Sequence, residues 1–344
     1  MLYFQCDYAE GAHPRIIEAL TKTNMCQSVG YGKDEFCASA REKIKKACNT
    51  DGDVHFLVGG TQTNTTVISS VLRAHEGVVS AESGHIATHE TGAIEACGHA
   101  VIKLPGKDGK ITAQAVRDLC RSHFESETAE HTVKPGMVYV SHPTESGTLY
   151  TKSELEDLSV ACREYSIPLY LDGARLGYGL TSRCSDLTLE DIARLTDVFY
   201  IGGTKCGALF GEAVVITNDA IKADFRYHIK QHGGMLAKGR LLGIQFDVLF
   251  DGGLYFDICR HANELAMRIR DAFERKGDFL YGHSQTNQQF VLLSNAQLSR
   301  IRERFACDVW ERYNENYSIA RFCTSWATSD DAVDALVEYI ESSL

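Results

Sequence analysis

Short apolar runs alternate with amphipathic segments along most of this 344-residue chain. The run VHFLV (54–58) leads through GGTQTN into the helical stretch TTVISSVLRA (65–74). This alternation predicts an α/β fold built on a large, mostly parallel sheet. Further strands are expected at 136–141, 168–173, 197–203 and 212–217, with helices at 152–165 and 188–197.

The pattern changes after about residue 219, where the chain is predicted to become mostly helical. The most regular amphipathic stretch covers 256–277, followed by strands at 289–294 and 319–326 and a closing helix at 330–343. We therefore expect two domains. Residues 1–245 would form an N-terminal arm and a large α/β domain, and residues 246–344 a small C-terminal α+β domain.

Composition narrows the possible partners. The net charge of −11 argues against a nucleic-acid partner, and no apolar stretch is long enough to span a bilayer. The start, MLYFQCDYAEG, lacks the basic region and long apolar run of a signal peptide. Twelve scattered cysteines without a CxxC pair predict reduced side chains in a cytoplasmic protein, with no disulfide scaffold and no structural zinc site.

The candidate functional residues lie where predicted strands end, which is where open parallel sheets bind ligands. The turn GGTQTN places Gly60, Thr61 and Gln62 at the start of a helix, whose free N–H groups suit a phosphate. The turn is not a P-loop, because the GK[ST] ending is absent. A tight strand–helix turn capped by Thr61 is the alternative.

Two further strand ends carry charged groups. Asp172 emerges in YLDGARLG with Arg175 three residues later, and Lys205 follows Gly202 and Gly203 in GGTKCG. The alternatives are a structural ion pair for Asp172 and a solvated loop lysine for Lys205. The glycines favour a desolvated, closely approached lysine, because they clear space around the backbone.

The segment SGHIATHETG contains His85, His89 and Glu90. The spacing of its histidines occurs in zinc sites, but HExxH and a third ligand are absent, so no metal is expected. His85 is predicted instead to stack on a planar ligand, with a capping or core histidine as the alternative.

These four segments would together hold a phosphate, a basic ring nitrogen and an aldehyde. Pyridoxal 5′-phosphate carries all three groups, and its enzymes pair a Schiff-base lysine with an Asp or Arg at the pyridine nitrogen. The sequence therefore predicts this cofactor, joined to Lys205.

Over nearly its whole length the chain resembles the family of threonine aldolases and aromatic β-eliminating lyases. These are pyridoxal-phosphate enzymes with the aspartate aminotransferase fold (fold type I), with a large sheet of the seven-stranded type. YLDGARLG is the most specific match. The other matching segments are GGTKCGALFGE, GGTQTN, GHIATHETG, YGKDE (31–35) and RFCTSWATSDDAVDAL (321–336).

The resemblance implies a role for each matched cofactor residue. Lys205 would form the Schiff base, and Asp172 would keep the pyridine nitrogen protonated. His85 would stack on the ring and take part in proton transfer. The phosphate would be held by Gly60, Thr61 and Gln62.

The resemblance also implies contacts to the substrate. Arg175, beside the cofactor, and Arg321 would bind the α-carboxylate of an amino acid. Tyr31 would reach the site of a neighbouring subunit in a homodimer or homotetramer with shared active sites. Two positions depart from the family pattern. Cys6 stands where many members have a serine, and either His142 or Thr144 would replace a second active-site histidine.

The expected activity is aldol cleavage of a β-hydroxy-α-amino acid, of the L-threonine or L-allo-threonine type, to glycine and an aldehyde. Lyase chemistry by β-elimination from another amino acid is the alternative within the same cofactor class. A non-catalytic binding protein that keeps the fold, and a phosphate-binding α/β enzyme without the cofactor, are alternatives from other classes.

Overall fold

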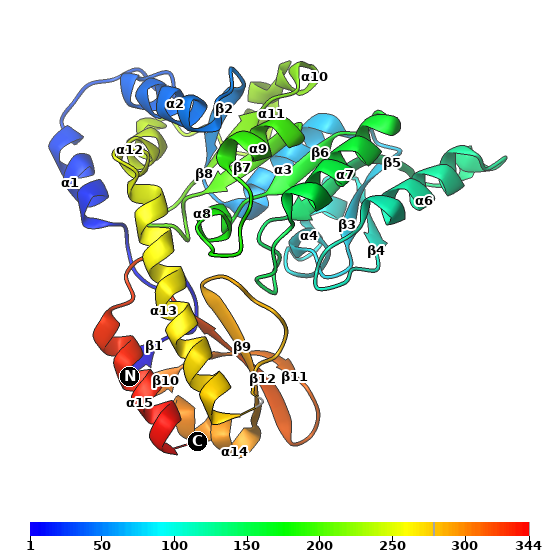
Figure 1. The fold of residues 1–344 in the computed structure, drawn as a ribbon. Coiled ribbons are helices and arrows are strands. Elements are labelled where there is room, and N and C mark those ends of the chain that lie inside the picture. Colours follow the sequence, from blue (N-terminus) through cyan, green and yellow to red (C-terminus); the bar gives the residue numbers. More distant parts are fainter. Residues whose placement is uncertain (278, 344) are drawn as a thin grey trace.

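The chain folds into a large α/β unit and a smaller α+β unit, which are connected by one long helix (Figure 1). The structure is a computed structural model that describes residues 1–277 and 279–343. Both predicted classes of architecture are confirmed: a large, mostly parallel sheet and a small C-terminal α+β part.

The large unit is built on a seven-stranded sheet with the order β2-β8-β7-β6-β5-β3-β4. Strand β8 runs antiparallel to both of its neighbours, and the other pairings are parallel. The strands are β2 (Asp53–Leu57), β3 (Glu76–Ala81), β4 (Ala100–Leu104), β5 (Lys134–Ser141), β6 (Leu169–Asp172), β7 (Val198–Gly202) and β8 (Glu212–Ile216).

Alternate residues of these strands point to opposite faces, so each face has its own apolar core. One core contains residues of α1, α2, α6, α7, α9, α12 and the start of α13. The core on the opposite face contains residues of α3, α4, α5, α10 and α11. The helices of the large unit are α1 (Pro14–Thr23), α2 (Glu35–Cys48), α3 (Gly60–Val71), α4 (His85–Thr88), α5 (Ala93–Ala96), α6 (Ala113–Phe124), η1 (Ala129–His131), α7 (Lys152–Glu164), α8 (Leu176–Leu180), α9 (Leu189–Leu195), α10 (Asp219–Lys222), α11 (Phe225–Gln231) and α12 (Arg240–Leu249).

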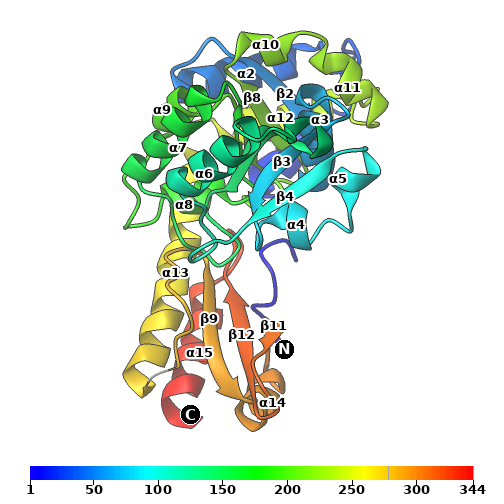
Figure 2. The same ribbon diagram turned by 90° about the vertical axis from the view of Figure 1, so that its right-hand side faces the viewer.

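The small unit carries an antiparallel sheet of β11 (Asp308–Arg312), β12 (Tyr317–Cys323) and β9 (Gln288–Ser294). Helices α13 (Leu254–Lys276) and α15 (Asp330–Ser343) pack together on one side of it (Figure 2). A short parallel pair, β1 (Leu2–Tyr3) with β10 (Phe305–Ala306), holds the N-terminus in this unit next to α14 (Asn295–Arg302).

The two units meet along α13. Tyr255 and Cys259 belong to the core of the large unit, whereas Leu265 and Ile269 belong to the core of the small one. The predicted boundary at residue 245 falls inside α12, upstream of this change of core.

Most predicted elements are present within one to three residues of their expected ends. The helix expected at 65–74 begins earlier, at Gly60, because the threonine-rich turn is itself the first part of α3. Thr188 and Asp191 form the capping box that starts α9. Strands β3 and β4 were not predicted, although the six residues of β3 are all buried.

Two global features follow from the described residues. None of their helices is long and apolar enough to cross a membrane. All twelve cysteines lie in this part of the chain as free thiols, and eight of them are buried.

Candidate active site

Asp172 ends strand β6 and is only 4% exposed. Its Oδ1 accepts hydrogen bonds from the Tyr200 hydroxyl (2.5 Å) and the Ala174 backbone N–H (3.0 Å). Its Oδ2 accepts hydrogen bonds from the Tyr139 hydroxyl (2.6 Å) and the Asn64 side-chain amide (3.2 Å). Both oxygens of this buried carboxylate are therefore held in place by hydrogen-bond donors.

His85 is linked to Asp172 through two intervening side chains. Its Nδ1 lies 2.7 Å from Glu90 Oε1, and the amide of Asn64 donates to the same oxygen at 2.7 Å. Burial works to lower the pKa of His85, but the hydrogen bond to Glu90 and the charge of Asp172 outweigh it and raise the pKa. Because Nδ1 is engaged by Glu90, Nε2 is the ring nitrogen left for a ligand.

The backbone of His85 is fixed by a second carboxylate. Its N–H donates to Glu145 Oε1 at 2.8 Å, and the Ser141 hydroxyl donates to the same oxygen at 2.7 Å. Burial raises the pKa of Glu145. The predicted stacking histidine therefore has both its main chain and its ring held in place.

Lys205 follows strand β7, next to the strand that carries Asp172. Burial lowers the pKa of Lys205, and the positive charge of Arg175 lowers it further, against the opposing effect of Asp7 and Asp172. The Tyr178 hydroxyl donates to the Lys205 carbonyl at 2.6 Å and fixes the backbone there. A desolvated lysine with a lowered pKa has the reactivity that Schiff-base formation needs.

The glycines before Lys205 serve the packing of the protein itself. A Cβ added at Gly202 would lie 2.3 Å from the Ala174 carbonyl oxygen, and one at Gly203 would lie 2.7 Å from the Gly211 carbonyl oxygen. The expectation that these glycines clear space for a ligand is therefore corrected, because the space is filled by neighbouring backbone.

Glu212 lies beneath the lysine loop and was not predicted as a site residue. The Thr204 hydroxyl donates to its Oε1 at 2.8 Å, and the Gly203 N–H donates to its Oε2 at 3.1 Å. Burial raises the pKa of Glu212 to about 8, although the charge of Lys205 acts to lower it. A buried carboxyl that accepts two hydrogen bonds from the lysine loop thus lies close to the reactive amine.

The predicted phosphate turn is the N-terminus of α3. The first helical amides, at Gly60, Thr61 and Gln62, have no intrahelical partner by helix geometry. Thr61 is exposed, whereas the Gln62 side chain closes the turn by accepting from the Val58 N–H and donating to the His232 carbonyl, both at 3.0 Å. Gln62 thus offers its backbone rather than its side chain.

Arg175 makes a two-point contact with Asp7 that the sequence did not predict. Its Nε donates to Asp7 Oδ2 at 2.7 Å and its Nη2 donates to Oδ1 at 3.0 Å. Asn287 of the small unit donates to the same carboxylate at 2.9 Å. Cys6, the expected substrate contact, is partly exposed and precedes Asp7. Arg175 thus has one edge occupied by protein and its Nη1 donors left over.

Neighbouring aromatic rings connect Arg321 on β12 to the histidine segment. The centroids of His85 and His89 are 5.6 Å apart, and those of His89 and Trp310 are 5.8 Å apart. The guanidinium of Arg321 lies 5.0 Å from the Trp310 ring and donates to Asp308 at 2.8 Å. Its Nε is buried without a hydrogen-bond partner among the described residues. The small unit therefore brings a cation toward the site.

His142 and Thr144 are the two positions expected to replace a second active-site histidine, and both are buried. The Nδ1 of His142 accepts from the Tyr150 N–H at 3.3 Å, and burial lowers its pKa to about 4. Thr144 exchanges a hydrogen bond with Thr148 at 2.6 Å. A substrate would reach either side chain only if the surrounding structure moved.

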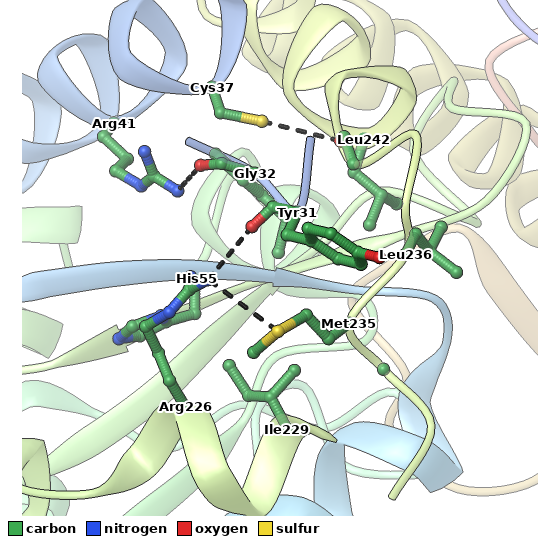
Figure 3. Close-up of a pocket in the computed structure, with 13 residues that line it drawn as sticks. Tyr31, Gly32, Cys37, Arg41, His55, Arg226, Ile229, Met235, Leu236 and Leu242 are labelled. Atoms are coloured by element: carbon green, nitrogen blue, oxygen red, sulfur yellow. Dashed lines mark hydrogen bonds between the residues drawn. The ribbon is translucent and has the colours of Figure 1, made fainter. Parts of the chain in front are cut away.

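Tyr31 lies in the left-handed region, with φ of 60°, and is 48% exposed. It lines a small cavity in which Arg226 donates to the Tyr31 carbonyl at 3.1 Å (Figure 3). The cavity measures about 30 Å³, which is room for one water. This cavity is too small for an amino acid, so it is not the substrate site.

Residues 6–296 match the model of the beta-eliminating lyase family. The chain belongs to this family, so it is an enzyme of the lyase class.

Two of the proteins to which the chain is similar are named threonine aldolases. The chain is 30% identical to the low specificity L-threonine aldolase of a Pseudomonas species, covering 98% of this chain and 97% of that protein. It is 45% identical to the solved threonine aldolase of Leishmania major, with a TM-score of 0.96 and 99% of each chain covered. Aspartate aminotransferase of Thermus thermophilus superposes with a TM-score of 0.72 over 100% of this chain and 92% of that one, at 14% identity. This last likeness establishes the expected fold.

Several residues of the site were missed from the sequence. Tyr139 and Tyr200 each lie two positions before the end of a strand that flanks β6, and this shared offset is a signal that could have found them. Asp7 and Glu145 gave no such signal, because their partners Arg175 and His85 are far away in the sequence. Glu212 was missed although its partners are only eight and nine positions away.

Proposed function

We propose that the chain binds pyridoxal 5′-phosphate at Lys205 and cleaves β-hydroxy-α-amino acids of the L-threonine or L-allo-threonine type to glycine and an aldehyde. The observation that carries the proposal is the placement of Asp172 and Lys205 at the ends of adjacent parallel strands. The likeness to proteins named threonine aldolases supports the choice of reaction.

The residues fit this cofactor. A buried, hydrogen-bonded Asp172 suits a protonated ring nitrogen, and a lysine of lowered pKa suits an aldehyde. The free amides of α3, with Thr61 exposed beside them, suit a phosphate. When bound, the cofactor supplies an electron sink for the pair left on Cα after the Cα–Cβ bond breaks.

The chain's own residues position the substrate and transfer the proton of its β-hydroxyl. Arg175, through Nη1, and Arg321 bind the α-carboxylate and so fix which Cα bond is broken. His85, held at Nδ1 by Glu90, exchanges a proton with the β-hydroxyl at Nε2. Cys6, which precedes Asp7 and is partly exposed, is assigned as a further substrate contact. His142 is assigned as a further substrate contact that becomes accessible when the surrounding structure moves, because its side chain is fully buried.

We assign the shared subunit contact to Tyr31 in a homodimer or homotetramer. Exposed apolar side chains near it support this, since Met25 is 88% exposed and Val29 64%. Light scattering should give at least twice the chain mass of 38.1 kDa. The free cysteines support a cytoplasmic location.

The test of the reaction is aldehyde release from L-threonine, L-allo-threonine and L-serine by the cofactor-loaded protein. We expect aldehyde from the threonine isomers. Pyruvate from serine in place of these aldehydes would favour β-elimination, which the family match keeps as the second candidate.

A further inference from the structure

Tyrosines occupy one face of three adjacent strands beside Asp172. Tyr139 on β5 is paired with Tyr170 on β6, and Tyr170 is paired with Val198, two positions before Tyr200 on β7. Because side chains two apart share a face, these three phenols and Asp172 all lie on the same side of the sheet. Tyr139 and Tyr200 are each 1% exposed.

Two of these phenols donate hydrogen bonds to the Asp172 carboxylate, one to each of its oxygens. Tyr200 donates to Oδ1 at 2.5 Å and Tyr139 donates to Oδ2 at 2.6 Å, the range of charge-assisted O–H···O⁻ bonds. Burial raises the pKa of both phenols well above the ordinary value, so near neutral pH they act as donors. The amides of Ala174 and Asn64 add one further hydrogen bond to each oxygen of the carboxylate.

The approach of Tyr200 depends on Gly60. A Cβ added at Gly60 would lie 3.3 Å from the Tyr200 hydroxyl oxygen, closer than most such contacts. The phenol that serves Asp172 therefore also packs against the first residue of α3, the expected phosphate turn.

These hydrogen bonds decide where a shared proton resides. When a carboxylate and a pyridine nitrogen share one proton in a buried site, low polarity favours the neutral pair with the proton on the carboxyl. Donors to the carboxylate favour the ion pair, with the proton on the ring nitrogen. Only the protonated ring is a strong electron sink.

We propose that Tyr139 and Tyr200 are positioning residues that keep Asp172 ionised, so that the proton stays on the ring nitrogen of the bound cofactor. This inference rests on the cofactor assigned above. Neither phenol needs to touch the substrate, because both act through Asp172.

The variants Tyr139→Phe, Tyr200→Phe and the double variant remove the hydroxyls and keep the rings that pack in the core, including the Tyr139–Tyr170 pair at 5.6 Å. Tyr150→Phe is the matched control. Its side chain is also buried, at 2% exposure, and its hydroxyl accepts a hydrogen bond from the Ile111 N–H. Among the described residues this hydroxyl makes no hydrogen bond to Asp172.

The experiment loads each protein with pyridoxal 5′-phosphate carrying ¹⁵N in the ring and records the ring-nitrogen chemical shift at one neutral pH. We expect the shift of a protonated ring in the wild type and in the control. The double variant should move toward the shift of a neutral pyridine, and each single variant should move less in the same direction. If the double variant does not fold, the single variants carry the test.

An unchanged shift in the Tyr139 and Tyr200 variants would overturn the inference, and so would an equal change in the control. Failure of the assigned cofactor is a distinct result, because the wild-type protein itself would then show no bound label and no visible absorption band.

Discussion

Arg175 and Asp7 form a buried ion pair in which two parallel N–H···O bonds, of 2.7 and 3.0 Å, join the N-terminal segment to the loop after β6. The Asp7 side chain is fully buried and that of Arg175 is 13% exposed. Asn287 adds a contact from the small unit, so three distant parts of the chain meet at one carboxylate. This pair makes the N-terminal segment part of the site.

Replacing Asp7 by Asn should destabilise the protein by about 3 kcal/mol, because it leaves a buried guanidinium without its counter-charge. The measurement is chemical denaturation near neutral pH. Asp251→Asn is the control, since Asp251 pairs with Arg15 at an exposed site, where such a pair contributes about 1 kcal/mol or less. Equal losses in the two variants would contradict this view of the pair.

The same pair predicts a pH dependence. Burial acts to raise the pKa of Asp7, but the charge and hydrogen bonds of Arg175 outweigh it and lower the pKa to about 2. A lowered pKa in the folded state gives stability that is present above the ordinary value of 3.8 and is lost as pH falls toward 2. Acid denaturation curves of wild type and Asp7→Asn should therefore converge in this range.

The lowered pKa of Lys205 should appear in cofactor loading. Free amine is the reacting form, so the visible band should grow with pH around a midpoint below the ordinary lysine value of 10.5. Arg175→Gln should move the midpoint up, because it removes a positive charge that disfavours the ammonium. Arg183→Gln, at an exposed position, should leave it in place. A downward move in the Arg175 variant would contradict the assignment.

Glu212 should make stability fall as pH rises. Its pKa, raised by burial to about 8, means that the folded state holds a proton that the unfolded state loses above 4.5. The stability from this group is complete below 4.5 and is lost as pH rises through 8. Glu212→Gln should flatten the dependence between these values, measured by denaturation across the range. If the stability of the variant changed with pH in parallel with that of the wild type, Glu212 would already be ionised in the folded protein.

Arg321→Lys should raise KM for the amino acid about 10- to 100-fold, with little change in kcat or in the cofactor spectrum. The reason is that lysine cannot reproduce the planar contact with Trp310 and the directed bond to Asp308 while also holding a carboxylate, a loss of about 1.5–3 kcal/mol. Arg312→Lys, an exposed residue of the same sheet, is the control. A fall in kcat at unchanged KM would place Arg321 outside substrate binding.

The sequence predicted those parts of the molecule whose signals are local. Periodicity placed most strands and helices, and the strand-end motifs placed Asp172, Lys205 and the start of α3. Strand β3 was missed because Glu76, Gly77 and Ser80 leave only a short apolar run, although all six residues are buried. The structure requires Gly77, since a Cβ there would lie 2.9 Å from the Ala100 carbonyl oxygen.

The parts that the sequence could not predict depend on distant partners. Asp7 meets Arg175 across 168 positions, and Asn64 meets Asp172 across 108. The use of Gly202 was misjudged for the same reason, because the backbone that approaches it comes from the loop after β6. The backbone that approaches Gly203 comes from Gly211, at the far end of its own loop.

The most direct test of the central claim is to load the protein with pyridoxal 5′-phosphate, reduce it with borohydride and map the modified peptide by mass spectrometry. The account predicts a single reduced adduct on Lys205 and none in Lys205→Ala, which should remain folded. An adduct spread over exposed lysines, or an equal adduct in the variant, would contradict it.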